Sequence, residues 1–444
     1  MLVSVLKTIF DIVYELLTQP AIIIGLLVAT GYALSKKTKI QVITGGVSAA
    51  VGLMLVLFGG RMFSEGFKPV VEEVSNIYGI QGYLMDSYAM KASTQEVLGD
   101  NFGFVGYVFL IAFMVNVILV YFNKYTKAKG IFLTGNAGVA HSQALLWLLS
   151  YWLDMSWIPT IILSGILLGI YWAIATTVPI KAINKITDNA GFTIGHNQNF
   201  GIWFFSKFAH WFGDPEKDDA ENLNMPGWLG VFNHNVTAIA ITMTIFTGGF
   251  LLTIGISNIE VLSEGQPWYI YVINLGLEFS MYMVILLQGV RMMVGEITAS
   301  FKGIQEKLIP NAVPAIDVAA LLPFSANAAT LGFMFTTFGT IFSMLLLLVF
   351  KSPIMVIPGF IPLFFSGGPI GVLANKFGGY KSVMVCGILL GMIQSFGTVW
   401  TIPLLGMPDE IGWSGMFDFS TVWPAFLELL RIIAKSLSMG PYAM

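Results

Sequence analysis

Charged residues are scarce in this chain of 444 residues, and cysteine is almost absent. Asp, Glu, Lys and Arg together make up 11% of the sequence, whereas 56% of the residues are hydrophobic. So few charges cannot cover a fold of this size with a polar surface, which excludes an ordinary water-soluble protein. Cys386 is the one cysteine, which excludes a disulfide framework and a thiolate metal cluster. The net charge of −3 argues against nucleic acid as a partner.

Two chemical signatures are also missing. The phosphate-binding pattern GxxxxGK followed by Ser or Thr does not occur, so an ATP-driven pump would need its motor elsewhere. Histidines stand at four positions, but no two have a metal-ligand spacing such as i, i+4. We therefore expect no metal and no cofactor, and we interpret His141, His210 and His234 as packing or interfacial residues.

Long apolar runs dominate the sequence instead, and its mean hydropathy is +0.78. A helix needs about 20 mostly apolar residues to cross a bilayer. The runs predict an all-α, polytopic integral membrane protein, in one domain, with about ten or eleven transmembrane helices and some broken or re-entrant segments. They cover residues 16–35, 40–60, 101–123, 130–153, 155–180, 222–259, 265–290, 318–350, 352–375, 382–408 and 419–438. Residues 1–20 predict an amphipathic helix at the membrane interface.

The basic residues indicate which loops face the cytoplasm. Three lysines lie within 36–39 and three within 124–129, and basic loops of this kind stay on the cytoplasmic side. The runs 40–60 and 101–123 connect these two loops. The stretch 61–98 must therefore enter and leave on one side, or lie along the interface.

Two segments of the chain resemble each other. The sequence "GGRMFSEGFKPV", which begins at Gly59, and "GVRMMVGEITASFKGI", which begins at Gly289, are each followed by an aspartate, Asp86 and Asp317. The similarity predicts two halves, 16–212 and 225–425. An odd number of crossings in each half makes the repeat inverted, an architecture common among carriers. The alternative is that small, charged segments between helices merely look alike.

Ionisable and proline-rich segments mark candidate sites at membrane depth. Asp86 and Asp317 would cost several kcal/mol there unless they are paired or hydrated, so both are candidates for a binding site. The alternative for each is a carboxylate that caps the end of a helix. The segment 357–371 contains Pro358, Pro362 and Pro369 and cannot be a regular helix throughout. Broken backbone of this kind is tolerated where it lines a cavity or is buried in protein.

A third polar segment is "DNAGFTIGHNQNFG", residues 188–201. It carries His196 beside Asn197, Gln198 and Asn199. Neutral imidazole and amide groups donate and accept hydrogen bonds at once, which suits the hydroxyl groups of a sugar or polyol better than an ion. The residues alone therefore predict a carrier for a small hydroxylated solute, with broken elements of two repeats around a central polar site.

Several motifs carry a resemblance to a known family. They are "FKPVVEEVSNIYGIQG", "IFLTGN", "GFTIGHNQNF", "MPGWLGVF", "KLIPNAVPAID" and "VIPGFIPLFFSGGPIGVLANKFGG". In order and spacing they resemble the membrane (IIC) subunit of the ascorbate family of bacterial phosphotransferase systems, from about residue 15 to about residue 425.

The resemblance implies a multi-pass homodimer in the bacterial cytoplasmic membrane, with interleaved scaffold and core subdomains. A separate IIB subunit with a phosphocysteine, supplied by a IIA subunit, would phosphorylate the sugar held in the IIC site. The chain itself would then be a non-catalytic, translocating subunit. L-ascorbate is the leading substrate, and a related sugar or polyol is the alternative.

The resemblance also implies a set of substrate-binding residues: Gly59, Gly60, Asp86, Ser87, Tyr88, Asn136, His196, Asn197 and Asp317, with Ala140 at a further binding position. Some positions depart from the family pattern. Leu57 and Gly60 replace Gln and Ser, Asn136 replaces His, and Ala140 and Asn197 both replace Gln. These departures leave the identity of the substrate open.

Two other classes of function also remain open. One is a secondary transporter coupled to H⁺ or Na⁺, with Asp86 or Asp317 as the coupling carboxylate. The other is a channel or scaffold without turnover, in which the polar segments serve only helix packing.

Overall fold

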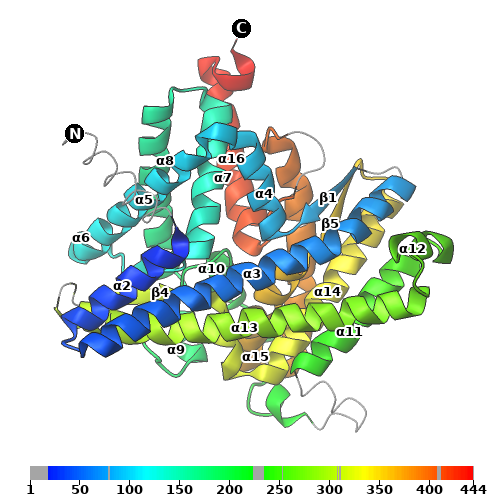
Figure 1. The fold of residues 1–444 in the computed structure, drawn as a ribbon, viewed down its shortest axis with the longest axis horizontal. Helices are drawn as coiled ribbons and strands as arrows, with labels where there is room; N and C mark the ends of the chain where they lie inside the picture. Colours follow the sequence, from blue (N-terminus) through cyan, green and yellow to red (C-terminus); the bar gives the residue numbers. More distant parts are fainter. Residues whose placement is uncertain are drawn as a thin grey trace.

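The computed structural model describes residues 19–78, 81–223, 235–252, 254–307, 309, 312–407 and 412–443. This part of the chain is mainly helical, with short connections and two small parallel sheets (Figure 1). The prediction of an all-α, polytopic membrane protein is confirmed, although the sequence did not predict the two sheets. The predicted interfacial helix of residues 1–20 lies almost wholly outside the described residues, and so does His234.

Four helical segments of the described chain are long and apolar enough to cross a membrane. They are Phe104–Tyr121, Trp157–Ile186, Ala326–Val349 and Ile361–Leu404. Two shorter apolar helices, Ile24–Leu34 and Lys39–Leu55, lie in further predicted runs. All six overlap runs predicted from the sequence, and Ile361–Leu404 spans two of them, 352–375 and 382–408. The total of ten or eleven crossings stays a prediction.

Two long helices lie side by side across the molecule (Figure 1). They are α3 (Lys39–Tyr78) and α13 (Trp268–Lys307), each of 40 residues. An ideal Cβ on Gly52 would lie 2.7 Å from Gly289 O, so glycine allows the two backbones to approach closely. The sequence predicted that a crossing ends at residue 60. Instead, α3 continues through Gly59 and Gly60 to Tyr78.

The remaining helices complete the described part of the chain. Their bounds are α2 (Pro20–Leu34), α4 (Ser87–Leu98), η1 (Gly99–Gly103), α5 (Phe104–Tyr121), α6 (Asn123–Thr126), α7 (Gly135–Leu153), α8 (Trp157–Thr177), α9 (Ile180–Ile186), α10 (Asn199–Phe205), η2 (Ala209–Trp211), η3 (Ala220–Asn222), α11 (Asn235–Leu252), α12 (Ile256–Leu262), η5 (Val318–Phe324), α14 (Ala326–Val349), α15 (Phe360–Thr401), η6 (Ile402–Leu404), α16 (Phe417–Leu437) and η7 (Gly440–Tyr442). Helices α2 and α11 both pack against α13.

Each small sheet joins strands that are far apart in the sequence. Strand β1 (Gln81–Met85) pairs in parallel with β5 (Ile354–Pro358), and Met85 also bridges Trp413. In the second sheet β4 (Val313–Ile316) lies between β2 (Gly130–Phe132) and β3 (Thr193–Ile194). The strand that follows each long helix thus pairs with strands from the other end of the chain. This pairing satisfies backbone groups that a helix would otherwise satisfy.

The segment 357–371 is broken at one point only. Strand β5 ends at Pro358, and α15 begins at Phe360 and includes Pro369. The predicted break therefore occurs at the start of the segment, and the rest is helical. A second bend lies further along α15 at Gly379, where φ is 72°. Both arms of α15 belong to the apolar segment Ile361–Leu404, and α15 packs extensively against α14.

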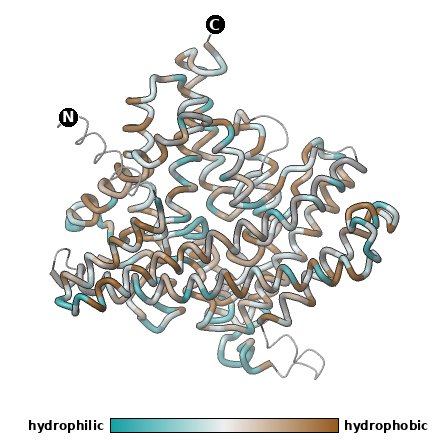
Figure 2. The backbone as a smooth tube through the Cα atoms, viewed as in Figure 1, coloured by the Kyte–Doolittle hydropathy of each residue, from teal (hydrophilic) through white to brown (hydrophobic). Residues whose placement is uncertain are grey.

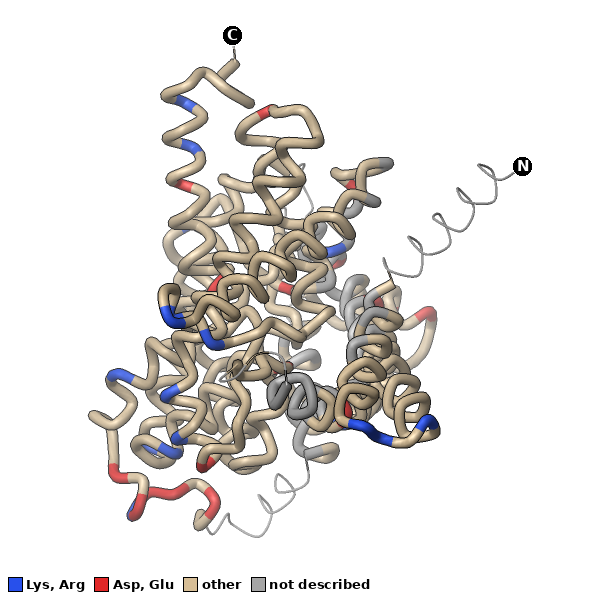
Figure 3. Tube along the Cα trace, turned by 90° about the vertical axis from the view of Figure 1, so that its left-hand side faces the viewer, with Lys and Arg blue, Asp and Glu red and all other residues tan. Residues whose placement is uncertain are grey.

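An acidic loop, residues 214–221, holds this second bend. Asp218 O accepts a hydrogen bond from Tyr380 N at 2.6 Å, and the Asp218 carboxylate lies 3.0 Å from Lys381 Nζ. The hydrogen bond from Lys381 lowers the pKa of Asp218, so this carboxylate stays ionised at neutral pH. Glu221, further along the loop, accepts hydrogen bonds from Ser325 Oγ and from the backbone of Asn327, at the start of α14. The loop lies at the lower left of Figure 3, where acidic residues gather.

Gly379→Ala tests the role of this bend. An ideal Cβ at Gly379 would lie 2.4 Å from Asp218 O, and its positive φ is strained for alanine. We expect the variant to lose at least about 2 kcal/mol of stability, seen as a lower thermal midpoint in detergent. Gly295→Ala is the control, because its ideal Cβ has nothing within 4 Å. Equal midpoints for the two variants would contradict this role.

Candidate functional site

Most of the predicted site residues lie where a strand ends. Asp86 follows β1, and Ser87 is the first residue of α4. His196 and Asn197 come shortly after β3, and Asp317 follows β4 directly. Because β1 and β4 each pair with strands from the other end of the chain, these residues are brought together from both ends of the sequence.

Asn197 has a fixed hydrogen-bond partner that the sequence did not reveal. Its Oδ1 lies 2.5 Å from Nε2 of His141, a buried residue of α7. Trp172 Nε1 donates to Nδ1 of the same ring at 2.9 Å. An indole N–H can only donate, so Nδ1 of His141 accepts and the ring proton lies on Nε2. His141 therefore donates to Asn197 and has a specific role beside the predicted site.

The other end of the Asn197 amide leads to a second predicted residue. Asn197 Nδ2 donates to Ser414 Oγ at 3.2 Å, and Ser414 Oγ lies 2.8 Å from Ser87 Oγ. All three side chains are buried. A continuous chain of hydrogen bonds thus connects Trp172, His141, Asn197, Ser414 and Ser87. Ser414 lies 217 residues from Asn197 in the sequence, and no local pattern pointed to it.

A buried carboxylate holds the backbone of the same segment. Asp418 accepts hydrogen bonds from Asn199 N at 3.1 Å and from Phe200 N at 3.0 Å, at the start of α10. It also accepts from Tyr171 OH at 3.2 Å, and its own N–H donates to Asn197 O at 3.0 Å. These bonds satisfy the buried carboxyl group of Asp418. The segment that carries His196 and Asn197 is therefore held in place from two sides.

Several polar atoms in this segment have no protein partner among the described residues. They are Nδ1 of His196, Nε2 of Gln198, and both Nδ2 and Oδ1 of Asn199, all of them buried. Leaving such an atom unmatched costs about 1–3 kcal/mol. A ligand with hydroxyl groups could satisfy atoms of this kind, because they include both donors and acceptors. The His196 ring also lies near the ring of Phe365, with 6.5 Å between the centroids.

The two predicted aspartates both cap helices. Asp317 Oδ1 accepts from Ala319 N at 2.9 Å, and Asp86 Oδ1 accepts from Ala89 N at 3.2 Å. The capping role that the sequence left open is therefore present at both positions. Asp317 also acts electrostatically on His196 of the polar segment. The carboxylate of Asp86 lies against Gly359, between β5 and α15.

Lys91 is a further charged residue that sequence reasoning missed. It lies on α4, and its Nζ donates to Asn136 Oδ1 at the start of α7. Its charge acts on Asp86 and on His196. The rule that marks ionisable residues in apolar surroundings as site candidates selected Asp86 and applies equally to Lys91.

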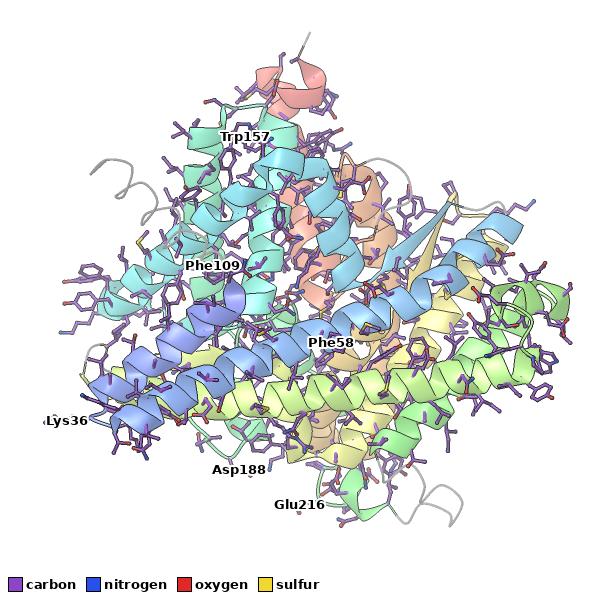
Figure 4. The ribbon with its side chains drawn as sticks, in the orientation of Figure 1. Lys36, Phe58, Phe109, Trp157, Asp188 and Glu216 are labelled. Atoms are coloured by element: carbon purple, nitrogen blue, oxygen red, sulfur yellow. The ribbon has the colours of Figure 1, made fainter. Side chains whose placement is uncertain are left out.

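The remaining predicted positions border this region. Gly59 and Gly60 lie within α3, which contacts both β1 and α4, and the neighbouring Phe58 is labelled near the centre of Figure 4. Ala140 is buried on α7, directly before His141. Tyr88 belongs to α4, and its side chain is not among those that the structure describes. In the described part of the chain, no three His, Cys, Asp or Glu residues are grouped as metal ligands.

The fold and the buried polar segment define a helical membrane protein with a polar centre built from both ends of the chain. The family model described as "PTS system sugar-specific permease component" matches residues 15–423, where PTS denotes the phosphotransferase system. The chain therefore belongs to this family, which confirms the resemblance found in its motifs.

One curated relative is the "Ascorbate-specific PTS system EIIC component" of Mycoplasma pneumoniae. The two sequences are 28% identical over 424 residues, which cover 85% of this chain and 64% of the relative. The chain thus spans slightly less than two thirds of that protein's length.

His141→Leu tests the hydrogen-bond chain. The change leaves Asn197 Oδ1 without its donor and Trp172 Nε1 without its acceptor, at about 1–3 kcal/mol for each buried group. We expect a clear fall in the thermal midpoint, followed by tryptophan fluorescence in detergent. His141→Gln keeps one donor and one acceptor and should lose much less. If the Leu variant is as stable as the Gln variant, His141 only fills space.

Proposed function

We propose that the chain is the membrane permease (IIC) component of a sugar phosphotransferase system. It would bind L-ascorbate, or a related sugar or polyol, and carry it across a bacterial cytoplasmic membrane while a separate IIB subunit phosphorylates it. The observation that carries this proposal is the buried segment 196–199, in a chain of the permease family. Its unmatched imidazole and amide atoms suit the hydroxyl groups of a sugar.

The relative from Mycoplasma pneumoniae supports L-ascorbate as the first substrate to test. The sequence departs from the family pattern at Leu57, Gly60, Asn136, Ala140 and Asn197. These departures support a substrate pocket that differs in detail from that of other family members. In this pocket Asn197 Oδ1 accepts a hydrogen bond from His141 and Asn197 Nδ2 donates one to Ser414, which fixes the orientation of the amide. A fixed amide discriminates between substrates because a wrong hydroxyl geometry leaves a buried group unpaired.

We propose that the phosphate comes from another subunit. Cys386, the one cysteine, is fully buried in α15, and its sulfur lies 3.6 Å from Ser382 Oγ. A thiol in this position cannot meet a phosphate donor in solution. We therefore propose separate IIB and IIA partners. The IIB subunit would meet the cytoplasmic face that carries Lys181 and Lys185, where Lys185 Nζ lies 4.0 Å from the ring of Phe377.

We infer that residues 16–212 and 225–425 form two inverted repeats. The order of elements supports this inference, because a 40-residue helix precedes β1 in one half and β4 in the other, and a capping aspartate follows each strand. Helices α2, α3, α11 and α13 would form a scaffold subdomain, and the helices around the two sheets would form the core subdomain. The two subdomains interleave along the chain.

We also propose a homodimer formed through the scaffold. One face of α3 exposes an apolar stripe at spacings of three and four residues: Ile40, Ile43, Val47, Val51, Met54 and Phe58. Hydrophobic residues recur along α3 and α13 in Figure 2. An apolar stripe of this kind can pack against lipid or against the same stripe of a second copy.

His196→Ala tests the substrate site. The variant loses a buried imidazole with one unmatched nitrogen, so we expect affinity for L-ascorbate to fall at least about tenfold, while the elution volume in size-exclusion chromatography stays unchanged. His210→Ala is the matched control, because His210 is exposed on η2. Calorimetry gives the affinities, and wild-type affinity in the His196 variant would remove His196 from the site.

A transport experiment tests the mechanism. Vesicles that contain only this protein should equilibrate labelled substrate without accumulating it, because the chain has no phosphate donor of its own. Addition of phosphoenolpyruvate and the full relay should give concentrative uptake of a phosphorylated product. Replacement of the phosphocysteine in IIB should stop this uptake.

The same experiment also tests the rival mechanism, an ion-coupled secondary transporter. If unmodified substrate accumulates without the relay, driven by an H⁺ or Na⁺ gradient, the phosphotransferase mechanism is wrong. Asp86 and Asp317 would then be the first carboxylates to test for ion coupling. Uptake that never exceeds equilibrium, even when phosphoenolpyruvate and the full relay are present, would indicate a channel.

A further inference from the structure

Helix α4 holds a lysine against the first turn of α7. The Lys91 ammonium donates to Asn136 Oδ1, and the Lys91 carbonyl accepts from Gln143 Nε2 at 3.1 Å. The same Gln143 nitrogen also donates to Thr94 Oγ1, one turn further along α4. Two residues of α7 thus fix both the side chain and the backbone of Lys91. The position of its charge is therefore set by packing between helices and does not depend on one flexible side chain.

The ammonium of Lys91 is hydrogen-bonded to Asn136, one of the predicted site residues. It interacts electrostatically with Asp86, which comes from the end of β1. It also acts on His196, which follows β3, and on His141 of α7. Asp317, at the end of β4, acts on His196 from another element. Lys91 is the cation in this group of described residues, and its charge reaches the segment that carries the unmatched imidazole and amide atoms.

A partly buried ammonium is costly in a membrane protein. Removing an ammonium from water costs several kcal/mol, and a neutral amide oxygen such as that of Asn136 offsets only part of this. Asp86 offsets a further part. A helix that packs against the glycine-rich start of α7 could carry an apolar residue at this position at lower cost. The ammonium instead places a positive charge beside Asn136, where it would attract a ligand with a negative charge.

We propose that Lys91 is a specificity-determining residue that selects the ionised form of an acidic sugar derivative over a neutral polyol or lactone of similar shape. This inference rests on the proposed function, because it assigns the ligand of the same site. The neutral groups of residues 196–199 would bind hydroxyl groups, and Lys91 would supply the attraction for the ligand's negative charge. A lysine acts here as a point charge, so the preference should follow the charge of the ligand more than its detailed shape.

A pair of ligands separates charge from shape. L-Ascorbate is an anion at neutral pH, and L-galactono-1,4-lactone is a neutral lactone with a similar carbon skeleton. Binding of both is measured by calorimetry on the full-length protein in detergent at pH 7. Wild-type protein should prefer ascorbate. Lys91→Met should weaken ascorbate binding roughly tenfold or more, as expected for loss of a charge-assisted contact, and should change lactone binding less than about threefold.

Further variants control for folding and for charge in general. Lys91→Arg keeps the positive charge and should retain the preference for ascorbate. Lys91→Gln keeps a donor for Asn136 Oδ1 without the charge and should behave like Lys91→Met, so it replaces that variant if the methionine does not fold. Lys435→Met removes an exposed lysine in the last turn of α16 and should change neither affinity. Thermal midpoints verify that each variant is folded.

Three outcomes would overturn the inference. The first is an unchanged ratio of ascorbate to lactone affinity in both Lys91→Met and Lys91→Gln. The second is an equal loss for both ligands, which would make Lys91 a purely structural partner of Asp86 and Asn136. The third is wild-type protein that binds the lactone as well as ascorbate or better, or that binds neither.

The proposed function can be disproved independently of the role of Lys91. A protein that binds ascorbate through Lys91 but shows no uptake with the phosphotransferase relay would leave the specificity role intact and remove the mechanism. A protein that is driven by the relay but ignores the charge of its substrate would do the reverse. Transport and binding are therefore measured on the same variants.

Discussion

Non-helical backbone inside an apolar protein must find its hydrogen bonds within the protein, and this constraint organises the whole structure. The chain meets it by pairing β1 with β5 and by placing β4 between β2 and β3. Each pairing joins segments from opposite halves of the sequence. The strands are short, and regular backbone pairing stops directly before the polar residues that follow them. A polar site at these strand ends is a direct consequence.

The same constraint explains why the polar residues near the site are so firmly held. Asp86 and Asp317 use one oxygen each to cap the helix that follows, and Asp418 uses both of its oxygens to hold the start of α10. The chain of hydrogen bonds through His141 and Asn197 continues this pattern into the side chains. A buried network is favourable only when its members are satisfied, so the few unmatched atoms around residues 196–199 stand out as places for a ligand.

Close packing of long helices provides the frame for this centre. Gly52 lets α3 lie directly against α13, and the positive φ of Gly379 lets α15 turn back along α14. Lys91 depends on the same kind of packing, because Asn136 and Gln143 of α7 determine where its charge lies. The acidic loop around Asp218 stabilises the bend of α15 from outside the apolar segments. Frame and polar centre are thus coupled through a small number of close contacts.

The sequence by itself determined the membrane environment, the helical class and the family, because these depend on composition, on the length of apolar runs and on motifs of adjacent residues. It also selected Asp86, His196, Asn197 and Asp317, since polar side chains in apolar surroundings are conspicuous without any structure. Only the tertiary structure revealed the two sheets, because their strands are too short to show an alternation of polar and apolar residues in the sequence. It alone joined His141, Ser414 and Asp418 to Asn197, because hydrogen bonds across 56 and 217 residues leave no periodicity in the sequence. The unbroken course of α3 through Gly59 and Gly60 was likewise decided by its packing against α13 rather than by local propensity.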